Sequence, residues 1–236
     1  MNEIEEIKKQ LEKKAIEFVV GGFKPTHSMN ESWIGRVYLY EEDEEIPIDD
    51  NGEQMIPLFQ LCLDNLVSIP HAVPHALAGT KALTVFISQE LPMDLVNNGE
   101  NWLIREYKNS DTLVIKDLTN KKSNLKPFPL QLRIVEKDYP VWDGGGIPEE
   151  IEDKILALED EGEIDSYYDM VECCYTHKLG GYPTFCQSGI DFGNDFEFIF
   201  QIASDTKVQL NIVDNGTIFL AKNSKTGEWK FYCDFH

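Results

Sequence analysis

His177 to Gln187 read HKLGGYPTFCQ, a stretch in which two glycines and a proline restrict the course of the backbone. Gly180 and Gly181 can adopt backbone angles that other residues avoid. Pro183 fixes its own φ, lacks an N–H donor and biases the preceding residue towards an extended conformation. The stretch therefore predicts a tight turn that leads into an extended segment over residues 182–186.

Two strands are predicted to follow this turn. Residues 196–202, FEFIFQI, are almost continuously apolar, aromatic and β-branched, which is typical of a buried strand. Residues 214–216, DNG, are a hairpin-turn signal, and residues 217–221 form the returning strand. We therefore predict a β-meander. The residues predicted to have a structural role at its turns are Gly180, Gly181, Pro183 and Gly216.

A weaker copy of this layout occurs in the first half of the chain. Three segments match in the same order: FQLCLD at 59–64 matches FQIASD at 200–205, IGRVYL at 34–39 matches LGGYPT at 179–184, and LTVFIS at 83–88 matches residues 216–221. A separation of about 140 residues is much longer than the period of a solenoid repeat. The matches predict an internal duplication, and chance similarity between apolar strands is the alternative.

The same segments resemble those of a known family. HKLGGYP at 177–183, the Phe-Gln-Ile strand at 200–202 and the hairpin DNGTIF at 214–219 are similar to the YwqG-like family of uncharacterised bacterial proteins. The resemblance is specific from His177 to Leu220. In the first half, residues 32–37, SWIGRV, keep one glycine of the family's turn and lack its proline. The resemblance implies a largely antiparallel, duplicated α+β fold without established activity, and for some members an immunity role beside polymorphic toxins.

The composition is that of a globular, strongly acidic protein. The chain has 236 residues, 42% of them hydrophobic and 11% aromatic, enough for one large domain or two fused lobes. Its formal net charge is −21, which repels nucleic acid phosphates and anionic lipid. We therefore expect neither nucleic acid nor a membrane as a partner, whereas a basic protein would be attracted.

A cytoplasmic location is predicted from three features. The first twenty residues contain glutamates where a secretory signal needs an apolar core, and no apolar run approaches the ~20 residues that span a bilayer. The five cysteines form no Cys-x-x-Cys pair and fit reduced thiols.

We predict an α+β fold with mainly antiparallel sheets in two duplicated, related lobes, an N-terminal helix and a short helical insert between the lobes. The predicted parts, which together make one compact domain, are an N-terminal helix at 1–20, a first β-rich lobe at 21–140, an acidic helical connector at 141–176 and a second β-rich lobe at 177–236. The N-terminal helix is predicted from apolar residues that recur at steps of three and four from Ile4 to Phe18. A helix beginning after Pro148 and a short one at 167–174 are expected in the connector.

Two acidic segments are candidates for a partner surface. Residues 41–53 lack the ligand spacing of an EF-hand, so calcium binding is not expected there. Residues 149–165 contain nine acids and one lysine. The predicted partner-binding residues are Glu149, Glu150, Glu159, Asp160, Glu161 and Glu163.

Motifs for catalysis, cofactors and metals are incomplete. Gln187-Ser188-Gly189 lacks the first glycine of a serine-hydrolase elbow, and the glycines at 144–146 lack the context of a phosphate loop. Cys173 and His177 would meet if they shared a helix face, but no oxyanion site accompanies them. His71 and His75 have the spacing of a zinc pair, yet Pro70 and Pro74 disfavour the helix that it needs. We predict no catalytic residue, no cofactor and no metal.

The sequence therefore favours a non-enzymatic, cytoplasmic binding protein whose acidic surface attracts a basic protein, and an immunity protein against a basic toxin is the most specific form of this hypothesis. The alternative is a small-ligand-binding protein or an enzyme that uses a cleft between the duplicated lobes.

Overall fold

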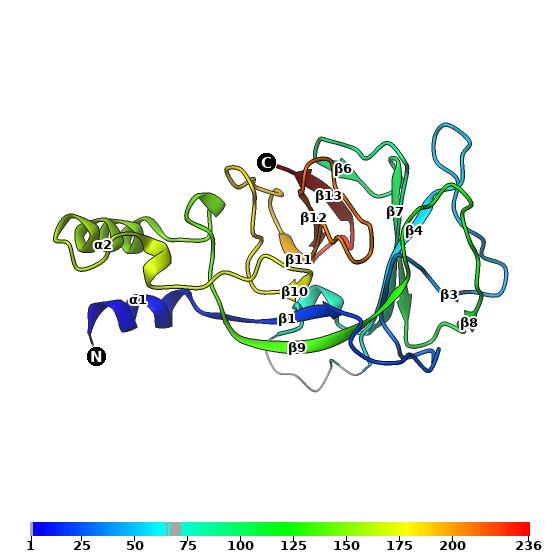
Figure 1. Ribbon diagram of the computed structural model, residues 1–236, viewed down its shortest axis with the longest axis horizontal. Helices are drawn as coiled ribbons and strands as arrows, with labels where there is room; N and C mark the ends of the chain where they lie inside the picture. Colours follow the sequence, from blue (N-terminus) through cyan, green and yellow to red (C-terminus); the bar gives the residue numbers. More distant parts are fainter. Residues whose placement is uncertain (1, 65, 67–71) are drawn as a thin grey trace.

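The computed structural model describes residues 2–64, 66 and 72–236 (Figure 1). The helices are α1 (Glu3–Leu11), η1 (His75–Leu77), η2 (Trp142–Gly144), α2 (Glu149–Asp160) and η3 (Tyr167–Asp169), where η denotes a 3-10 helix. The strands are β1 (Lys13–Val20), β2 (Trp33–Ile34), β3 (Leu39–Tyr40), β4 (Ile56–Cys62), β5 (Thr80–Ile87), β6 (Val96–Asn97), β7 (Trp102–Lys108), β8 (Val114–Ile115), β9 (Phe128–Asp138), β10 (Lys178–Gly180), β11 (Phe196–Ala203), β12 (Thr217–Asn223) and β13 (Trp229–Asp234).

Within the described residues, one 11-stranded sheet has the order β6-β13-β12-β11-β10-β1-β9-β2-β4-β5-β7, and β3 pairs with β8 separately. Every pairing is antiparallel. The predicted α+β class with mainly antiparallel sheet is therefore confirmed. The two predicted lobes are not separate sheets, because strands from both belong to the same one.

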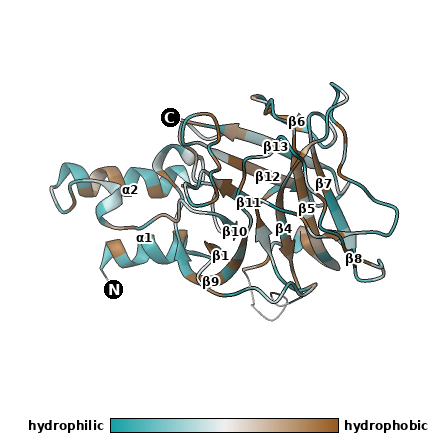
Figure 2. Ribbon diagram, turned by 45° about the vertical axis from the view of Figure 1, so that its right-hand side comes forward, coloured by the Kyte–Doolittle hydropathy of each residue, from teal (hydrophilic) through white to brown (hydrophobic). Residues whose placement is uncertain are grey.

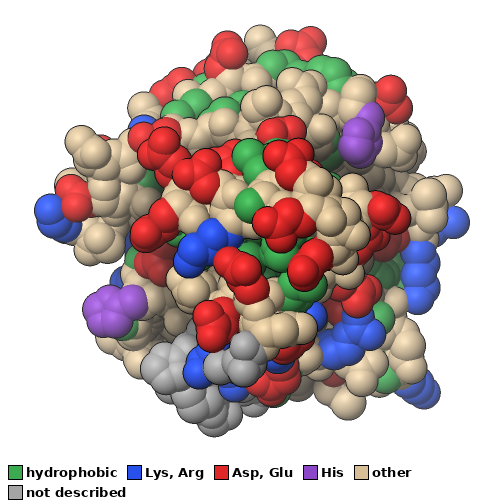
Figure 3. Space-filling model, turned by 90° about the vertical axis from the view of Figure 1, so that its left-hand side faces the viewer, with side chains coloured by type: hydrophobic (Ala, Val, Ile, Leu, Met, Phe, Trp, Pro, Cys, Tyr) green, Lys and Arg blue, Asp and Glu red, His purple; other side chains and the backbone are tan. Residues whose placement is uncertain are grey.

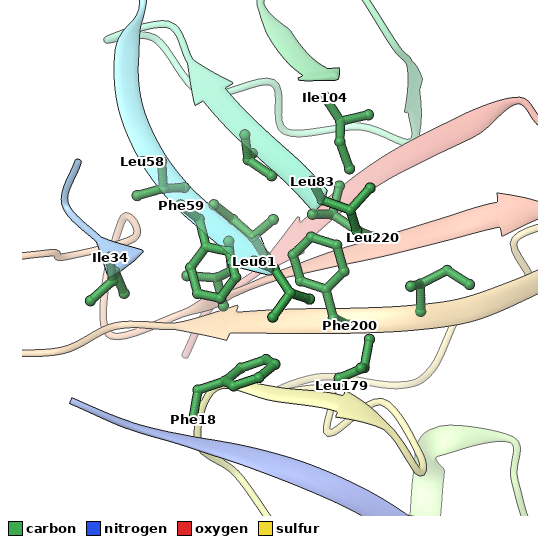
Figure 4. Packing of buried hydrophobic residues seen from close by; sticks show 14 of the residues in the cluster. Phe18, Ile34, Leu58, Phe59, Leu61, Leu83, Ile104, Leu179, Phe200 and Leu220 are labelled. Carbon is green, nitrogen blue, oxygen red and sulfur yellow. The ribbon is translucent and has the colours of Figure 1, made fainter. Parts of the chain in front are cut away.

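The sheet has two wings that face each other across a shared core. We call β2, β4, β5 and β7 the first wing, and β10, β11, β12 and β13 the second wing. The rings of Phe59 in β4 and Phe200 in β11 stack with centroids 5.7 Å apart, and Phe18 from β1 packs against Phe59 (Figure 4). Trp102 of β7 contacts Phe231 of β13 at 5.3 Å. Hydrophobic segments accordingly concentrate along these strands (Figure 2).

The centre of the sheet exchanges strands between the two halves of the chain. β1, which precedes the first wing in sequence, pairs with β10 of the second wing. β9, which precedes the second wing, pairs with β2 of the first. From the centre outward the order is thus β1-β10-β11-β12-β13 on one side and β9-β2-β4-β5-β7 on the other. Each wing is completed by a strand from the other half of the sequence.

A second core lies at one end of the molecule, where α1 and α2 extend away from the sheet (Figure 1). Ile7 and Leu11 of α1 are buried against Ile151 and Ile155 of α2. Residues 161–173 return from α2 across this core towards the sheet, with Tyr167 fully buried. We call α1, α2 and residues 161–173 the helical end.

The prediction of one helix over residues 2–18 is wrong in its second part. α1 ends at Leu11, and residues 13–20 form β1, the strand between β9 and β10. The apolar residues of this segment are spaced at three and four, but they are also β-branched or aromatic. Because β1 is buried among neighbouring strands, its partners in the sheet decide its conformation rather than its own periodicity.

Three further expectations also differ from the structure. The helix expected at 167–174 is reduced to η3. The alternating residues from Trp33 to Tyr40 predict one continuous strand, but this segment is split into β2 and β3, because Gly35 has a φ of +76°. The tight hairpin expected before residue 217 is a long connection over residues 204–216. No helix in the described part of the chain combines the length and apolar character required to cross a bilayer.

Candidate functional site

The turn at Gly180 and Gly181 brings the backbone against two oxygen atoms. Both glycines have positive φ, +70° and +69°. A Cβ added at Gly181 would lie 2.1 Å from Oδ2 of Asp138, and one at Gly180 would lie 2.4 Å from the carbonyl oxygen of Ala72. No side chain fits at either position, so the glycines permit this close approach.

The oxygen beside Gly181 belongs to a fully buried ion pair. Lys178 Nζ lies 2.7 Å from Asp138 Oδ2, and both side chains are completely inaccessible. The backbone N–H of Tyr182 donates to the same oxygen at 2.9 Å, and that of Cys174 donates to Oδ1 at 3.1 Å. With every acceptor occupied and no opening to solvent, the pair acts as a structural clamp between β9 and β10.

His177 is also used structurally. Its Nδ1 accepts from the backbone N–H of Ala203 at 3.1 Å, which leaves the proton on Nε2, 3.6 Å from Asp205 Oδ2. The hydrogen bond from His177 lowers the pKa of Asp205 to about 2. Cys173 lies elsewhere: its thiol donates to the carbonyl oxygen of Pro140 at 3.4 Å, and burial raises its pKa to about 11. The Cys–His pair considered from the sequence is not formed, and this thiol is not activated as a nucleophile.

The acidic segment 149–165 lies on the surface of the helical end (Figure 3). α2 turns Ile151, Ile155 and Leu158 towards α1 and leaves its acids on the solvent side. Of the six residues predicted to bind a partner, Glu159 is half-buried and the others are exposed. Among the described residues, no acid of this segment forms an ion pair.

In the other acidic segment, residues 41–53, two of the eight acids form ion pairs within the described part of the chain. Glu44 pairs with Arg105 at 3.2 Å, and Glu53 pairs with Lys122. Lys116 Nζ donates to the carbonyl oxygens of residues 42 and 44 at 2.6 and 2.8 Å. The two acidic segments therefore differ, since the one at the helical end keeps its charge uncompensated.

Two cavities border the turn that opens the second wing. One, of about 550 Å³, is lined by Gly180 and Gly181 together with charged residues of both signs, including Lys13 and Glu197. The other, of about 700 Å³, lies between residues 184–188 and the helical end. Either volume is within the ~300–1,000 Å³ of small-molecule sites.

A metal centre is not evident in the described ranges, which contain no group of three or more His, Cys, Asp and Glu side chains arranged to hold an ion. His75 is exposed at the start of η1. His71 lies outside the described residues, so the pairing of these two histidines is not described.

A comparison with family models places the chain in a family. Residues 33–231 match the family described as "Domain of unknown function (DUF1963)", and the chain belongs to this family. The match runs from β2 into β13 and leaves α1 and β1 outside it. The expected membership of a family of unknown function is thus confirmed, and the YwqG-like assignment stays a resemblance. No curated protein matches the chain.

Sequence reasoning missed the buried polar contacts that organise the site. Gln60 and Gln201 are fully buried and bond to backbone groups of the neighbouring turns. The available signal was a glutamine inside an otherwise apolar strand, since a buried amide needs partners. Asp138 and Lys178 gave no comparable signal, because their pairing joins residues forty positions apart.

Proposed function

We propose that this protein is a non-enzymatic, cytoplasmic binding protein whose helical end recognises a basic protein partner. The observation that carries the proposal is the uncompensated charge of residues 149–165, in contrast to residues 41–53. Leu156, 44% exposed on α2, adds an apolar contact among these acids. A charged surface with an apolar centre is suited to a protein partner.

Electrostatic attraction would act before contact. A net charge of −21 steers a basic protein towards the chain, and the attraction weakens as salt shortens the screening length. An acidic surface can also cover a basic nucleic-acid-binding site by complementarity. With the family resemblance, this supports the more specific proposal of an immunity protein against a basic toxin.

Capture from a bacterial lysate at low and at high salt tests the proposal. We expect one basic protein to be retained in stoichiometric amount at low salt and released at high salt. A bait that retains no basic protein at either salt concentration would contradict the proposal.

A second candidate function, small-ligand binding or catalysis in a cleft, is supported by the cavity of about 550 Å³. Its lining combines Val73 and His75 from the first predicted lobe with Gly180 and Phe198 from the second. Charge reversal on α2 separates the two candidates, because it should abolish partner binding and leave an activity in the cleft intact.

We infer that the two wings are copies of one ancestral unit. Gln60 and Gln201 occupy the same place, since each accepts from the turn after β2 or β10 and donates to a carbonyl group before it. β4 and β11 carry a bulge at the same position relative to these glutamines. Trp102 and Trp229 start β7 and β13 opposite Ile87 and Lys222. This register equates residues 82–87 with 217–222, so the sequence match of 83–88 with 216–221 is offset by two residues. Chance resemblance between strands does not account for shared bulges and hydrogen bonds.

A further inference from the structure

The two wings differ at four equivalent positions that lie together at one edge. Leu39 and Thr184 each donate their N–H to the buried glutamine of their wing. The other three pairs follow from the strand registers. In the first wing Ala82 pairs with both Cys62 and Tyr107. In the second wing Thr217 pairs in the same way with both Ala203 and Asp234. The equivalent pairs are therefore Leu39 and Thr184, Cys62 and Ala203, Ala82 and Thr217, and Tyr107 and Asp234.

In the first wing this place is a closed apolar cluster. Leu39, Cys62, Ala82 and Tyr107 are buried together, and Leu113 from the segment before β8 completes the cluster. Met29 packs against it from outside. No room is left for a ligand, because the chain itself fills the space.

In the second wing the same place is open and polar. Thr184, Ala203 and Thr217 line the cavity of about 700 Å³. Tyr168 from the helical end and Tyr175, which follows the helical end in the sequence, form another part of the wall. Both tyrosines are about half-exposed, so their rings are available for stacking.

A buried carboxylate with a free acceptor, that of Asp234, lies next to the lining residues Cys186 and Gln187. Asp234 is 2% exposed, and its Oδ2 accepts from the backbone N–H groups of Cys186 and Gln187 at 2.8 and 3.2 Å. Its Oδ1 has no hydrogen-bond partner in the described part of the chain. Burial raises the pKa of Asp234, so protonation would supply a donor at the same place. Unpaired buried polar atoms are rare in folded proteins and indicate a missing partner.

The chemistry of the lining restricts the ligand. Among the described residues that line the cavity, Asp143 and His236 are the only ones with a carboxylate or imidazole side chain, and none is a lysine or arginine. The remaining polar groups are hydroxyls and amides, such as those of Ser188, Ser204 and Asn215. Such a surface, in a chain of net charge −21, disfavours anions and offers neutral hydrogen bonds.

We propose that this cavity binds an uncharged, hydroxyl-rich small molecule, a sugar or a nucleoside, held by hydroxyl and amide groups and stacked on tyrosine. Sugars and nucleosides share vicinal hydroxyls and a flat apolar face, which match these two kinds of wall. The site lies apart from the acids of α2 and is independent of the protein partner proposed above.

Ligand-observed NMR with separate sets of neutral mono- and disaccharides, nucleosides and their phosphorylated forms tests this proposal. We expect saturable binding by a neutral member of one set, which identifies the source, and weaker binding of its phosphorylated form. Absence of saturable binding throughout, or preference for the phosphorylated forms, would overturn the proposal.

Single substitutions in the lining test whether the ligand binds in this cavity. Thr184→Leu introduces the residue found at Leu39 and should weaken binding at least about tenfold. Gln201 keeps a partner in this variant, because its Nε2 also donates to the carbonyl oxygen of Thr176.

Tyr175→Ala, at an exposed position, gives a second test that does not depend on the core. Thr226→Leu, exposed at the other end of the β12–β13 hairpin, is the control and should bind normally. Equal affinity in all three variants would place the ligand elsewhere and contradict the proposal.

Discussion

At the scale of single residues, buried charges connect distant parts of the chain. Asp138 and Lys178 are fully inaccessible and join β9 to β10. Glu106 of β7 lies 2.7 Å from Lys222 Nζ of β12 and therefore links the outer strands of the two wings. Trp229 Nε1 donates to the same carboxylate at 3.2 Å. These contacts predict measurable effects on stability.

Removing one partner of the Asp138–Lys178 pair should strongly destabilise the protein. Lys178→Met leaves Asp138 charged and buried, and we expect the free energy of unfolding to fall by about 3–5 kcal/mol. The double substitution Asp138→Asn and Lys178→Met should lower the free energy of unfolding by less than the sum of the two single substitutions. Urea unfolding measures both values, and additive effects would contradict the clamp.

Glu106 should make stability depend on acidic pH. Burial alone raises its pKa, but hydrogen bonds from Lys108, Lys222 and Thr80 outweigh burial and lower the pKa to about 2. The stabilisation is therefore complete above the ordinary glutamate pKa of about 4.3 and is lost as pH falls through about 2. Urea unfolding between these pH values should show a steeper loss for the wild type than for Glu106→Gln. Parallel curves would contradict this assignment.

At the scale of elements, the strands with continuous apolar runs were predictable and β1 was not. Residues 196–203 and 217–223 are strands close to the predicted bounds of 196–202 and 217–221, because a buried run of aromatic and β-branched residues suits a sheet interior. β1 shows both helical and strand spacing, and only its pairing with β9 and β10 decides between them. That information is not local to the segment.

Gly35 follows β2 and Gly180 ends β10, and substituting them tests whether their close backbone contacts need a glycine. Their φ angles are +76° and +70°, and an added Cβ would lie 2.5 and 2.4 Å from a carbonyl oxygen. We expect Gly35→Ala and Gly180→Ala each to lower the free energy of unfolding by more than the ~1 kcal/mol of an unfavourable backbone angle. Gly52→Ala is the control, since Gly52 has a φ of +79° and no described atom within 4 Å of the added Cβ. An equal loss in all three variants would show that the close contacts do not matter.

The candidate sites were predictable to different degrees. The exposed acids of 149–165 follow from the sequence pattern, because charged residues interleaved with a periodic apolar stripe lie on the solvent side of a helix. The cavity of the second wing does not, since its lining residues Thr184, Ala203 and Thr217 are brought together only in the folded sheet. The matched segments at 59–64 and 200–205 indicated related halves but gave no sign that β1 and β9 are exchanged.

At the scale of the whole molecule, this exchange predicts that neither half folds alone. A fragment ending at Ser123 lacks β9, which pairs with both β1 and β2, and the remaining fragment lacks β1. We expect each fragment alone to lack a cooperative unfolding transition and the two together to form a complex, as measured by circular dichroism and size-exclusion chromatography. A cooperative transition in either isolated fragment would contradict the exchanged arrangement.

The uncompensated charge of the helical end is the feature from which we infer a protein partner. Charge reversal with a matched control tests this most directly. The test variant combines Glu159→Lys, Asp160→Lys, Glu161→Lys and Glu163→Lys. The control combines Glu90→Lys, Asp94→Lys, Glu100→Lys and Glu228→Lys, which are exposed elsewhere and give the same change in net charge.

The measurement is the affinity of each variant for the basic protein captured by the wild type at low salt, with thermal unfolding to show that both variants fold. We predict at least about tenfold weaker binding for the α2 variant than for the control. Equal weakening in the two variants would show that binding depends on net charge alone and not on the helical end. Unchanged binding by the α2 variant would contradict a partner surface at the helical end.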